Sequence, residues 1–157
     1  MRNGLILAIS FLLAFILTLL PMPEWAIWMR PAWVLLVVIY WNMAAPDQIS
    51  IGSAWALGLL LDVLSGTLFG EHALAMTIAS YFVVKTHARM KMFPLVQQGL
   101  CILLVVLLYQ FIIYCVQGFI HELPKTKLYW TSSLVSMLLW PWVVGVLRNL
   151  RYRVRMA

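Results

Sequence analysis

One acidic side chain, Asp62, lies inside a long apolar stretch of this sequence, and it is the residue best placed to do chemistry. The stretch covers residues 52–70, reads GSAWALGLLLDVLSGTLFG, and holds the one acid found within an apolar run. It is long enough to cross a bilayer. A charge at membrane depth costs about 2.5–3.5 kcal/mol on insertion scales. We therefore expect Asp62 to face a partner or a polar cavity and not lipid.

Several kinds of catalysis can be compared with the residues that the sequence offers around Asp62. Intramembrane aspartyl proteolysis needs two facing aspartates, one as base and one protonated, and only Asp62 lies at depth. Metal hydrolysis needs about three ligands of the His, Cys or carboxylate type, but His72, His87 and His121 are scattered. Ser65 has no base in helical register except Asp62, and a hydrogen bond within the helix explains that pair more simply. The sequence therefore predicts no enzyme, no cofactor and no metal site.

Two non-catalytic roles for Asp62 stay open. A lone intramembrane acid can hold a proton or a cation during transport, although one acid in so small a chain leaves little machinery for alternating access. Alternatively, Asp62 is a structural residue that forms hydrogen bonds with neighbouring helices. We favour the structural role and keep an ion or small-molecule binder that uses Asp62 as the alternative.

Small residues recur every four positions around Asp62, at Ala54, Gly58, Gly66 and Gly70. Four residues are slightly more than one helical turn, so Ala54, Gly58, Asp62 and Gly66 would form a slowly spiralling stripe. Such spacing lets a second helix approach closely. We expect this helix to lie at the centre of a bundle. The stripe could serve internal packing or a partner helix, and we favour internal packing.

The composition is that of an integral membrane protein. Of the 157 residues, 64% are hydrophobic and 10% are charged, whereas a soluble domain carries about 25% charged residues. The net charge of +6 does not indicate nucleic-acid binding, because the basic residues cluster at the ends of apolar runs, as topology signals do. Cys101 and Cys115 would lie about 21 Å apart along one helix, which is beyond the reach of a disulfide.

Apolar runs predict an all-α, six-transmembrane-helix bundle that forms a single domain over residues 1–157. The approximate spans are 4–20, 31–45, 49–69, 72–86, 95–120 and 130–147. The second and fourth spans could be partly re-entrant. Residues 71–72 read as a short connection and residues 85–91 as a basic loop. Pro141, between Trp140 and Trp142, is expected to kink the last helix.

The distribution of basic residues predicts the orientation. With six crossings, eight basic residues share one side: Arg2, Lys85, Arg89, Lys91, Arg148, Arg151, Arg153 and Arg155. The other side has three: Arg30, Lys125 and Lys127. Positive charge marks the cytoplasmic side, so both termini should be cytoplasmic. Asp62 would then lie roughly 10 Å below the external surface, within reach of Arg30 and His72. We expect an Asp62–Arg30 interaction that joins the second helix to the third.

Three groups of residues together resemble a known family. They are Arg30-Pro31-x-Trp33 with Leu35-Leu36, Tyr40-Trp41 and Pro46; Gly58-x-x-x-Asp62-x-x-x-Gly66-x-x-x-Gly70 with Ala73-Leu74 and Tyr81; and Leu139-Trp140-Pro141-Trp142 ahead of a basic tail. Their order and spacing, and the overall length, resemble the bacterial rod shape-determining protein family MreD, in its gammaproteobacterial form. The structural or partner-binding candidates are therefore Asp62, Arg30, Gly58, Gly66, Gly70, Trp140 and Pro141.

The resemblance implies a non-catalytic protein of the inner (cytoplasmic) membrane that acts in the elongasome, the machinery of lateral cell-wall synthesis. The main implied partner is the bitopic MreC. MreB, RodZ, and RodA with its penicillin-binding protein belong to the wider complex, and a homodimer stays open. The family's fold is similar to the S component of energy-coupling-factor vitamin transporters, which keeps a ligand pocket open, although fold is not function. We expect MreC to dock on the face of Gly58 and Gly66, or on the fifth helix with its glutamines and tyrosines.

Overall fold

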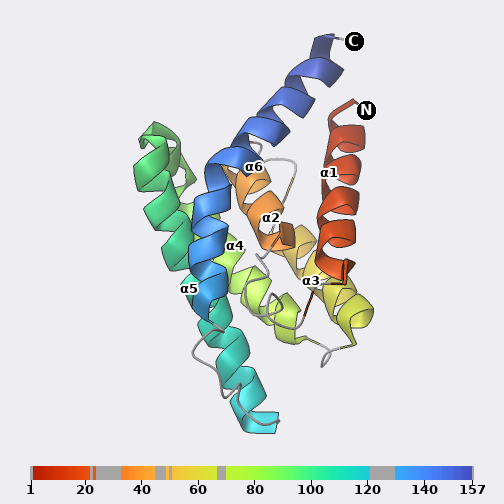
Figure 1. The fold of residues 1–157 in the computed structure, drawn as a ribbon, viewed down its shortest axis with the longest axis vertical. Coiled ribbons are helices and arrows are strands. Elements are labelled where there is room, and N and C mark those ends of the chain that lie inside the picture. Colours follow the sequence, from red (N-terminus) through yellow and green to blue (C-terminus); the bar gives the residue numbers. More distant parts are fainter. Residues whose placement is uncertain are drawn as a thin grey trace.

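The computed structural model describes residues 2–21, 23, 33–44, 49, 51–66, 70–120 and 130–156. Within these residues the chain is helical and has no strand (Figure 1). The helices are α1 (Arg2–Leu19), α2 (Trp33–Ala44), α3 (Ile51–Ser65), α4 (Glu71–Met92), α5 (Leu95–Ile120) and α6 (Thr131–Met156). The predicted all-α fold is confirmed.

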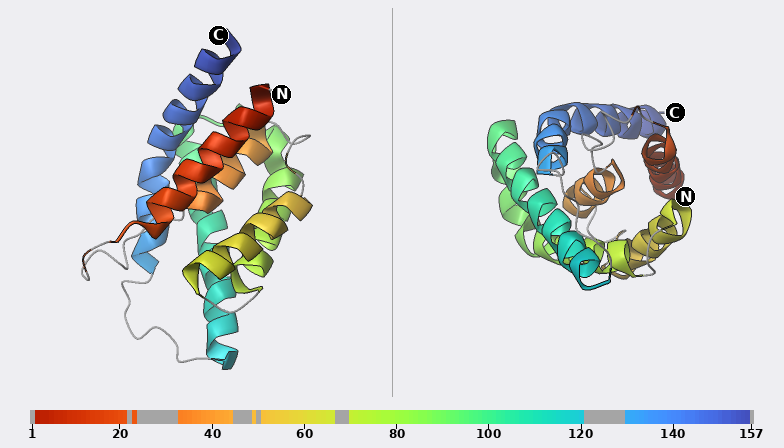
Figure 2. Two further views of the ribbon diagram at one scale, coloured as in Figure 1. Left: turned by 90° about the vertical axis from the view of Figure 1, so that its right-hand side faces the viewer. Right: turned by 60° about the horizontal axis from the view of Figure 1, so that its bottom comes forward.

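Helix α2 lies at the centre, and the other helices surround it (Figure 2). It packs against α1, α4 and α6, while the surrounding helices contact one another in the circular order α1, α3, α4, α5, α6. All residues of α2 from Val34 to Met43 are buried. A helix that is apolar on every side is typically buried. The prediction that the helix of residues 52–70 lies at the centre is wrong, since α3 exposes Trp55 and Val63 on the outside.

Helix α3 is shorter than the 49–69 span expected from hydropathy. It ends at Ser65, and Gly66 follows with φ of 68°. This left-handed conformation at the residue after a helix satisfies its last carbonyl groups and strongly favours glycine. Residues 67–69 lie outside the described part of the chain, and Gly70 has φ of 98°. Gly66 is therefore a helix stop and not a further member of the stripe formed by Ala54, Gly58 and Asp62.

The basic residues 85–91 and the basic tail after residue 147 are both helical, which corrects the loop predicted at 85–91. Helix α4 begins at Glu71 and continues through these residues, with Arg89 and Lys91 in its last turn. Positive charge at the C-terminal end of a helix is favourable because of the helix dipole. Phe93 then adopts an extended conformation (φ −77°, ψ 144°), as is usual for a residue before proline. The basic tail likewise continues α6 to Met156, whereas α5 has the expected bounds.

Two helices in the described part of the chain are long and apolar enough to cross a membrane. These segments are Leu95–Phe119, with mean hydropathy 2.6, and Thr131–Arg153, with mean hydropathy 1.4. Helices α1, α2 and α3 are apolar but shorter. At 1.5 Å per residue, α2 is about 18 Å long, well below the roughly 30 Å of a hydrocarbon core. Its surrounding helices shield α2 from lipid, so a short central helix can be accommodated.

Helix α6 changes direction along its length and has Pro141 in its interior (Figure 1). Proline removes one backbone hydrogen bond and clashes with the preceding turn, so a bend is expected there. The helix contacts α5, α2 and α1. Because of the bend, one helix can pack against α5 in its first part and lean over α2 toward α1 in its second part.

Candidate functional site

Asp62 forms hydrogen bonds with the first residues of α4. Its Oδ2 accepts from the backbone N–H of Gly70 at 2.9 Å and of Ala73 at 3.4 Å, and its Oδ1 accepts from the backbone N–H of His72 at 3.0 Å. The side chain is fully buried. The first N–H groups of a helix lack intrahelical partners, and an N-cap side chain usually accepts from them. The N-cap of α4, Gly70, has no side chain, and Asp62 of α3 takes over this role.

The imidazole of His72 adds a side-chain contact to the same carboxylate. Its Nδ1 lies 2.7 Å from Oδ1 of Asp62, so the ring donates a hydrogen bond when Nδ1 carries the proton. The ring also lies 6.1 Å from the ring of Tyr109, between centroids. His72 therefore connects the end of α3 to α5, and it was one of the two partners that the sequence suggested for Asp62.

Glu71, the residue before His72, makes a second polar contact between helices. It is 3% exposed, and one of its carboxylate oxygens accepts from Nε2 of Gln117 on α5 at 2.9 Å. This pair was not predicted, because residues 71–72 read as a connection between helices in the sequence. The missed signal is an acid directly after glycine at the start of an apolar run, which is typical of a helix N-terminus. Adjacent residues of α4 thus join it to α3 and to α5.

Gly58 lies where the backbones of α3 and α4 touch. A Cβ atom at this position would lie 2.4 Å from Cα and 2.7 Å from N of Ala73, and 2.9 Å from the carbonyl oxygen of His72. No side chain fits there, so Gly58 serves contact within the chain. Gly58 and Gly66 do not form the continuous free helix face on which MreC was expected to dock, because α4 covers Gly58 and Gly66 lies beyond the end of α3. Small-residue spacing indicates a close helix contact but not which helix makes it.

The Trp140-Pro141-Trp142 segment divides between the inside and the outside of the molecule. Trp140 is fully buried, and its Nε1 donates to Oε1 of Gln98 on α5 at 3.4 Å. Gln98 in turn donates from Nε2 to the carbonyl of Met90 on α4 at 2.9 Å. Pro141 and Trp142 are exposed. Trp140 therefore joins α4, α5 and α6 close to the α4–α5 connection, far along α4 from Asp62.

Arg30 lies outside the described residues, so the Asp62–Arg30 interaction stays a prediction. A charge-swap experiment, with arginine at position 62 and aspartate at position 30, would not test this interaction alone. An arginine at position 62 cannot accept the hydrogen bonds from α4, so that variant would also lose those bonds. We expect Asp62→Asn and Arg30→Gln to be non-additive, with a coupling above about 0.5 kcal/mol in thermal unfolding of the detergent-solubilised protein. Additive losses of stability would contradict the pair.

The contacts of Asp62 and His72 fix the start of α4 against α3 and α5. Within the described residues, no three His, Cys, Asp or Glu side chains are grouped so that they could hold a metal ion. The carboxylate oxygens of Asp62 accept hydrogen bonds from the chain's own backbone, which gives an ion or substrate role no support.

Comparison with known proteins agrees with the sequence resemblance. The family model for the rod shape-determining protein MreD matches residues 2–150. The chain is 34% identical over 149 residues to the rod shape-determining protein MreD of Haemophilus influenzae. The aligned region covers 93% of this chain and 90% of that protein. No solved structure matches, so the likeness to S components gains no support. MreD proteins are known for shape determination and not as enzymes. The chain is a membrane protein that belongs to the MreD family of rod shape-determining proteins.

Proposed function

We propose that this chain is a non-catalytic scaffold of the cell elongation machinery in the inner membrane, and that it acts by binding MreC. Family membership gives it a role in rod shape determination. In the proposal, this role is to hold MreC and, through the wider complex, MreB, RodZ, RodA and its penicillin-binding protein at sites of lateral peptidoglycan synthesis. The alternative, an ion or small-molecule binder that uses Asp62, is not favoured by the contacts of that residue.

The distribution of side chains between the inside and the outside carries this proposal. Polar groups such as Asp62, Glu71 and Ser136 are buried and hydrogen-bonded within the chain. Large apolar side chains such as Leu12 (62% exposed) and Leu138 (73%) lie on the outside. Packing and interhelical hydrogen bonds drive association in lipid. An apolar outer surface of this kind can contact transmembrane partners as well as lipid, which is what a membrane scaffold requires.

The position of the chain ends supports the proposed orientation with six crossings and cytoplasmic termini. Both termini and the α4–α5 connection lie in one half of the molecule, while the C-terminal end of α5 lies at the opposite end (Figure 1). The basic ends of α4 and α6 are therefore on the same side. Positive charge concentrated on one side is the usual mark of the cytoplasmic face.

Several polar residues of α5 are used within the chain, so they are not free for the docking surface expected on that helix, whereas Gln97 is exposed. Tyr109 and Gln110 are 6% and 5% exposed, and Gln117 is bonded to Glu71. The opposite face of α5 is apolar and exposed, with Leu104 at 67% and Phe119 at 91%. Helix α5 is about 39 Å long and extends past the other helices at its C-terminal end (Figure 1). We place the transmembrane helix of MreC on this outer face, where the projecting end can reach adjacent periplasmic segments.

Co-purification with MreC tests both the scaffold and its docking face. We expect tagged wild-type chain to bring down MreC from membranes in mild detergent. The double change Leu104→Ala and Phe111→Ala should lower the yield of MreC at least about five-fold, because truncation of central contacts costs more than about 1 kcal/mol each. Leu12→Ala with Ile16→Ala, on the comparably exposed face of α1, is the matched control.

Three results separate the parts of this proposal. Loss of MreC from the α5 variant, with the α1 variant unchanged, supports the face. Equal yields from wild type and α5 variant would exclude α5 as the docking surface. Absence of MreC beside a folded, monodisperse wild-type chain would contradict the scaffold itself.

A further inference from the structure

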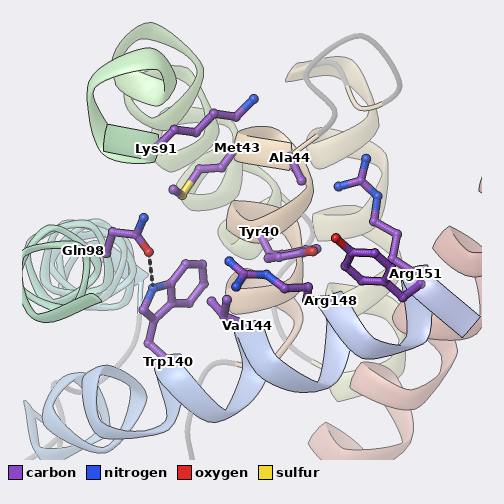
Figure 3. Close-up of a pocket in the computed structure, with 10 residues that line it drawn as sticks. Tyr40, Met43, Ala44, Lys91, Gln98, Trp140, Val144, Arg148 and Arg151 are labelled. Atoms are coloured by element: carbon purple, nitrogen blue, oxygen red, sulfur yellow. Dashed lines mark hydrogen bonds between the residues drawn. The ribbon is translucent and has the colours of Figure 1, made fainter. Parts of the chain in front are cut away.

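A cavity of about 420 Å³ opens between α2, α4, α5 and α6 (Figure 3). Among the residues that line it are Tyr40, Lys91, Gln98, Trp140, Arg148 and Arg151. Because Lys91 in the last turn of α4 lines it, the cavity lies beside the α4–α5 connection. Figure 1 shows that connection in the same half of the molecule as both termini. We call this space the basic cavity. Its volume is within the range of roughly 300–1,000 Å³ that is usual for small-molecule sites.

Positive charge is concentrated in the basic cavity without a carboxylate beside it in the described part of the chain. Lys91 comes from the last turn of α4, and Arg148 and Arg151 come from the basic end of α6. The buried acid of α4, Glu71, lies about 30 Å away along the same helix. Within the described residues, Asp62 is hydrogen-bonded to His72 at that distant end. Three like charges around one cavity repel each other unless an anion lies between them.

We propose that the basic cavity binds the phosphate of an anionic phospholipid headgroup. Arginine presents a planar set of donors that suits phosphate oxygens, and lysine adds a compact positive charge. Figure 3 shows Arg148 and Arg151 extending from α6 toward α2, with Lys91 of α4 on the other side of the cavity. The guanidinium of Arg151 also lies 5.7 Å from the centroid of the Trp41 ring, a cation–π contact that orients it.

The surroundings of the basic cavity favour a lipid over a free anion. Tyr152, which lines the cavity, is 61% exposed, and Met92, the residue after Lys91, is 87% exposed, so acyl chains can continue along the outside of the helices. The cavity is also much larger than inorganic phosphate requires. In the proposed orientation it opens at the cytoplasmic leaflet, where anionic lipids give a negative surface potential. Basic pockets of this kind between membrane helices bind anionic headgroups.

Lipid binding to the full-length chain in non-ionic detergent tests the proposal. We expect phosphatidylglycerol to raise the unfolding temperature by about 5 °C at saturation, and phosphatidylcholine to have little effect. Arg148→Gln with Lys91→Gln should weaken the apparent affinity for phosphatidylglycerol at least ten-fold. The matched control, Arg153→Gln with Lys85→Gln, removes the same charge from the same two helices outside the cavity and should change affinity less than two-fold.

Four results would overturn the proposal. They are equal stabilisation by both lipids, equal loss of affinity in both double variants, stabilisation by inorganic phosphate that matches phosphatidylglycerol, and full affinity in the cavity variant. If the cavity variant does not fold, the single change Arg148→Gln at an exposed position of α6 takes its place and should weaken affinity at least three-fold. None of these measurements involves MreC, so their failure leaves the scaffold proposal separately testable.

Discussion

Gly58→Ala is expected to disrupt the contact between α3 and α4, although it adds a single methyl group. The new Cβ would lie within 3.0 Å of three backbone atoms of His72 and Ala73, and backbone cannot rotate away as a side chain can. Overpacking a well-packed interior costs about 1–3 kcal/mol and sometimes more. We expect a loss of at least about 3 kcal/mol, which lowers the unfolding temperature by roughly 6–12 °C for a chain of this size.

The measurement is thermal unfolding of the detergent-solubilised chain, read together with size-exclusion profiles. Gly145→Ala is the matched control, since it lies within α6 and no atom comes within 4 Å of the added Cβ. Alanine is favoured over glycine in a helix by about 1 kcal/mol, so this control should be neutral or stabilising. Cell shape should change in the same way: in cells depleted of the wild-type protein, Gly145→Ala should restore rod shape and Gly58→Ala should not. Equal stability of the two variants would contradict the close approach at Gly58.

The parts of the fold that hydropathy and proline mark were predictable from the sequence. Helix α5 has its expected bounds because Pro94 precedes an uninterrupted apolar run up to Ile120. The end of α3 was not, because Gly66 looks like a member of the small-residue stripe until its positive φ is known. Charged residues 85–91 read as a loop, yet α4 continues through them because basic side chains suit a helix C-terminus.

Long-range contacts explain what the sequence could not predict about the sites. Asp62 was recognisable, and His72 was a candidate partner, but the main donors to its carboxylate are backbone N–H groups, which every sequence contains. The central place of α2 depends on how the five surrounding helices pack. The basic cavity joins Lys91 to Arg148 across more than 50 residues of sequence. From the sequence, the basic tail is a topology signal to which binding of anionic lipid can be added. Nothing local in the sequence indicates that Lys91 and the arginines of the tail line one space.

Asp62→Ala is expected to destabilise the start of α4 more than any other single polar change in the chain. It removes the acceptor for the backbone N–H groups of Gly70, His72 and Ala73 in a fully buried place. An unsatisfied buried donor costs about 1–3 kcal/mol, and loss of an N-cap side chain costs about 0.5–2 kcal/mol. Because neighbouring donors share one carboxylate, the costs do not add fully, and we expect a total of about 3–5 kcal/mol.

Graded variants distinguish this backbone role from a role of the His72 side chain or of a bound ion. Asp62→Asn keeps one acceptor oxygen but turns an amide toward N–H donors, so it should be nearly as harmful as alanine. His72→Phe keeps the backbone N–H bond and should cost about 1 kcal/mol, the usual worth of one hydrogen bond. Ser65→Ala, at an exposed position of α3, is the control and should have no effect. If Asp62→Ala had the same unfolding temperature as Ser65→Ala but cells that carry it lost their rod shape, Asp62 would act on a ligand and not on α4.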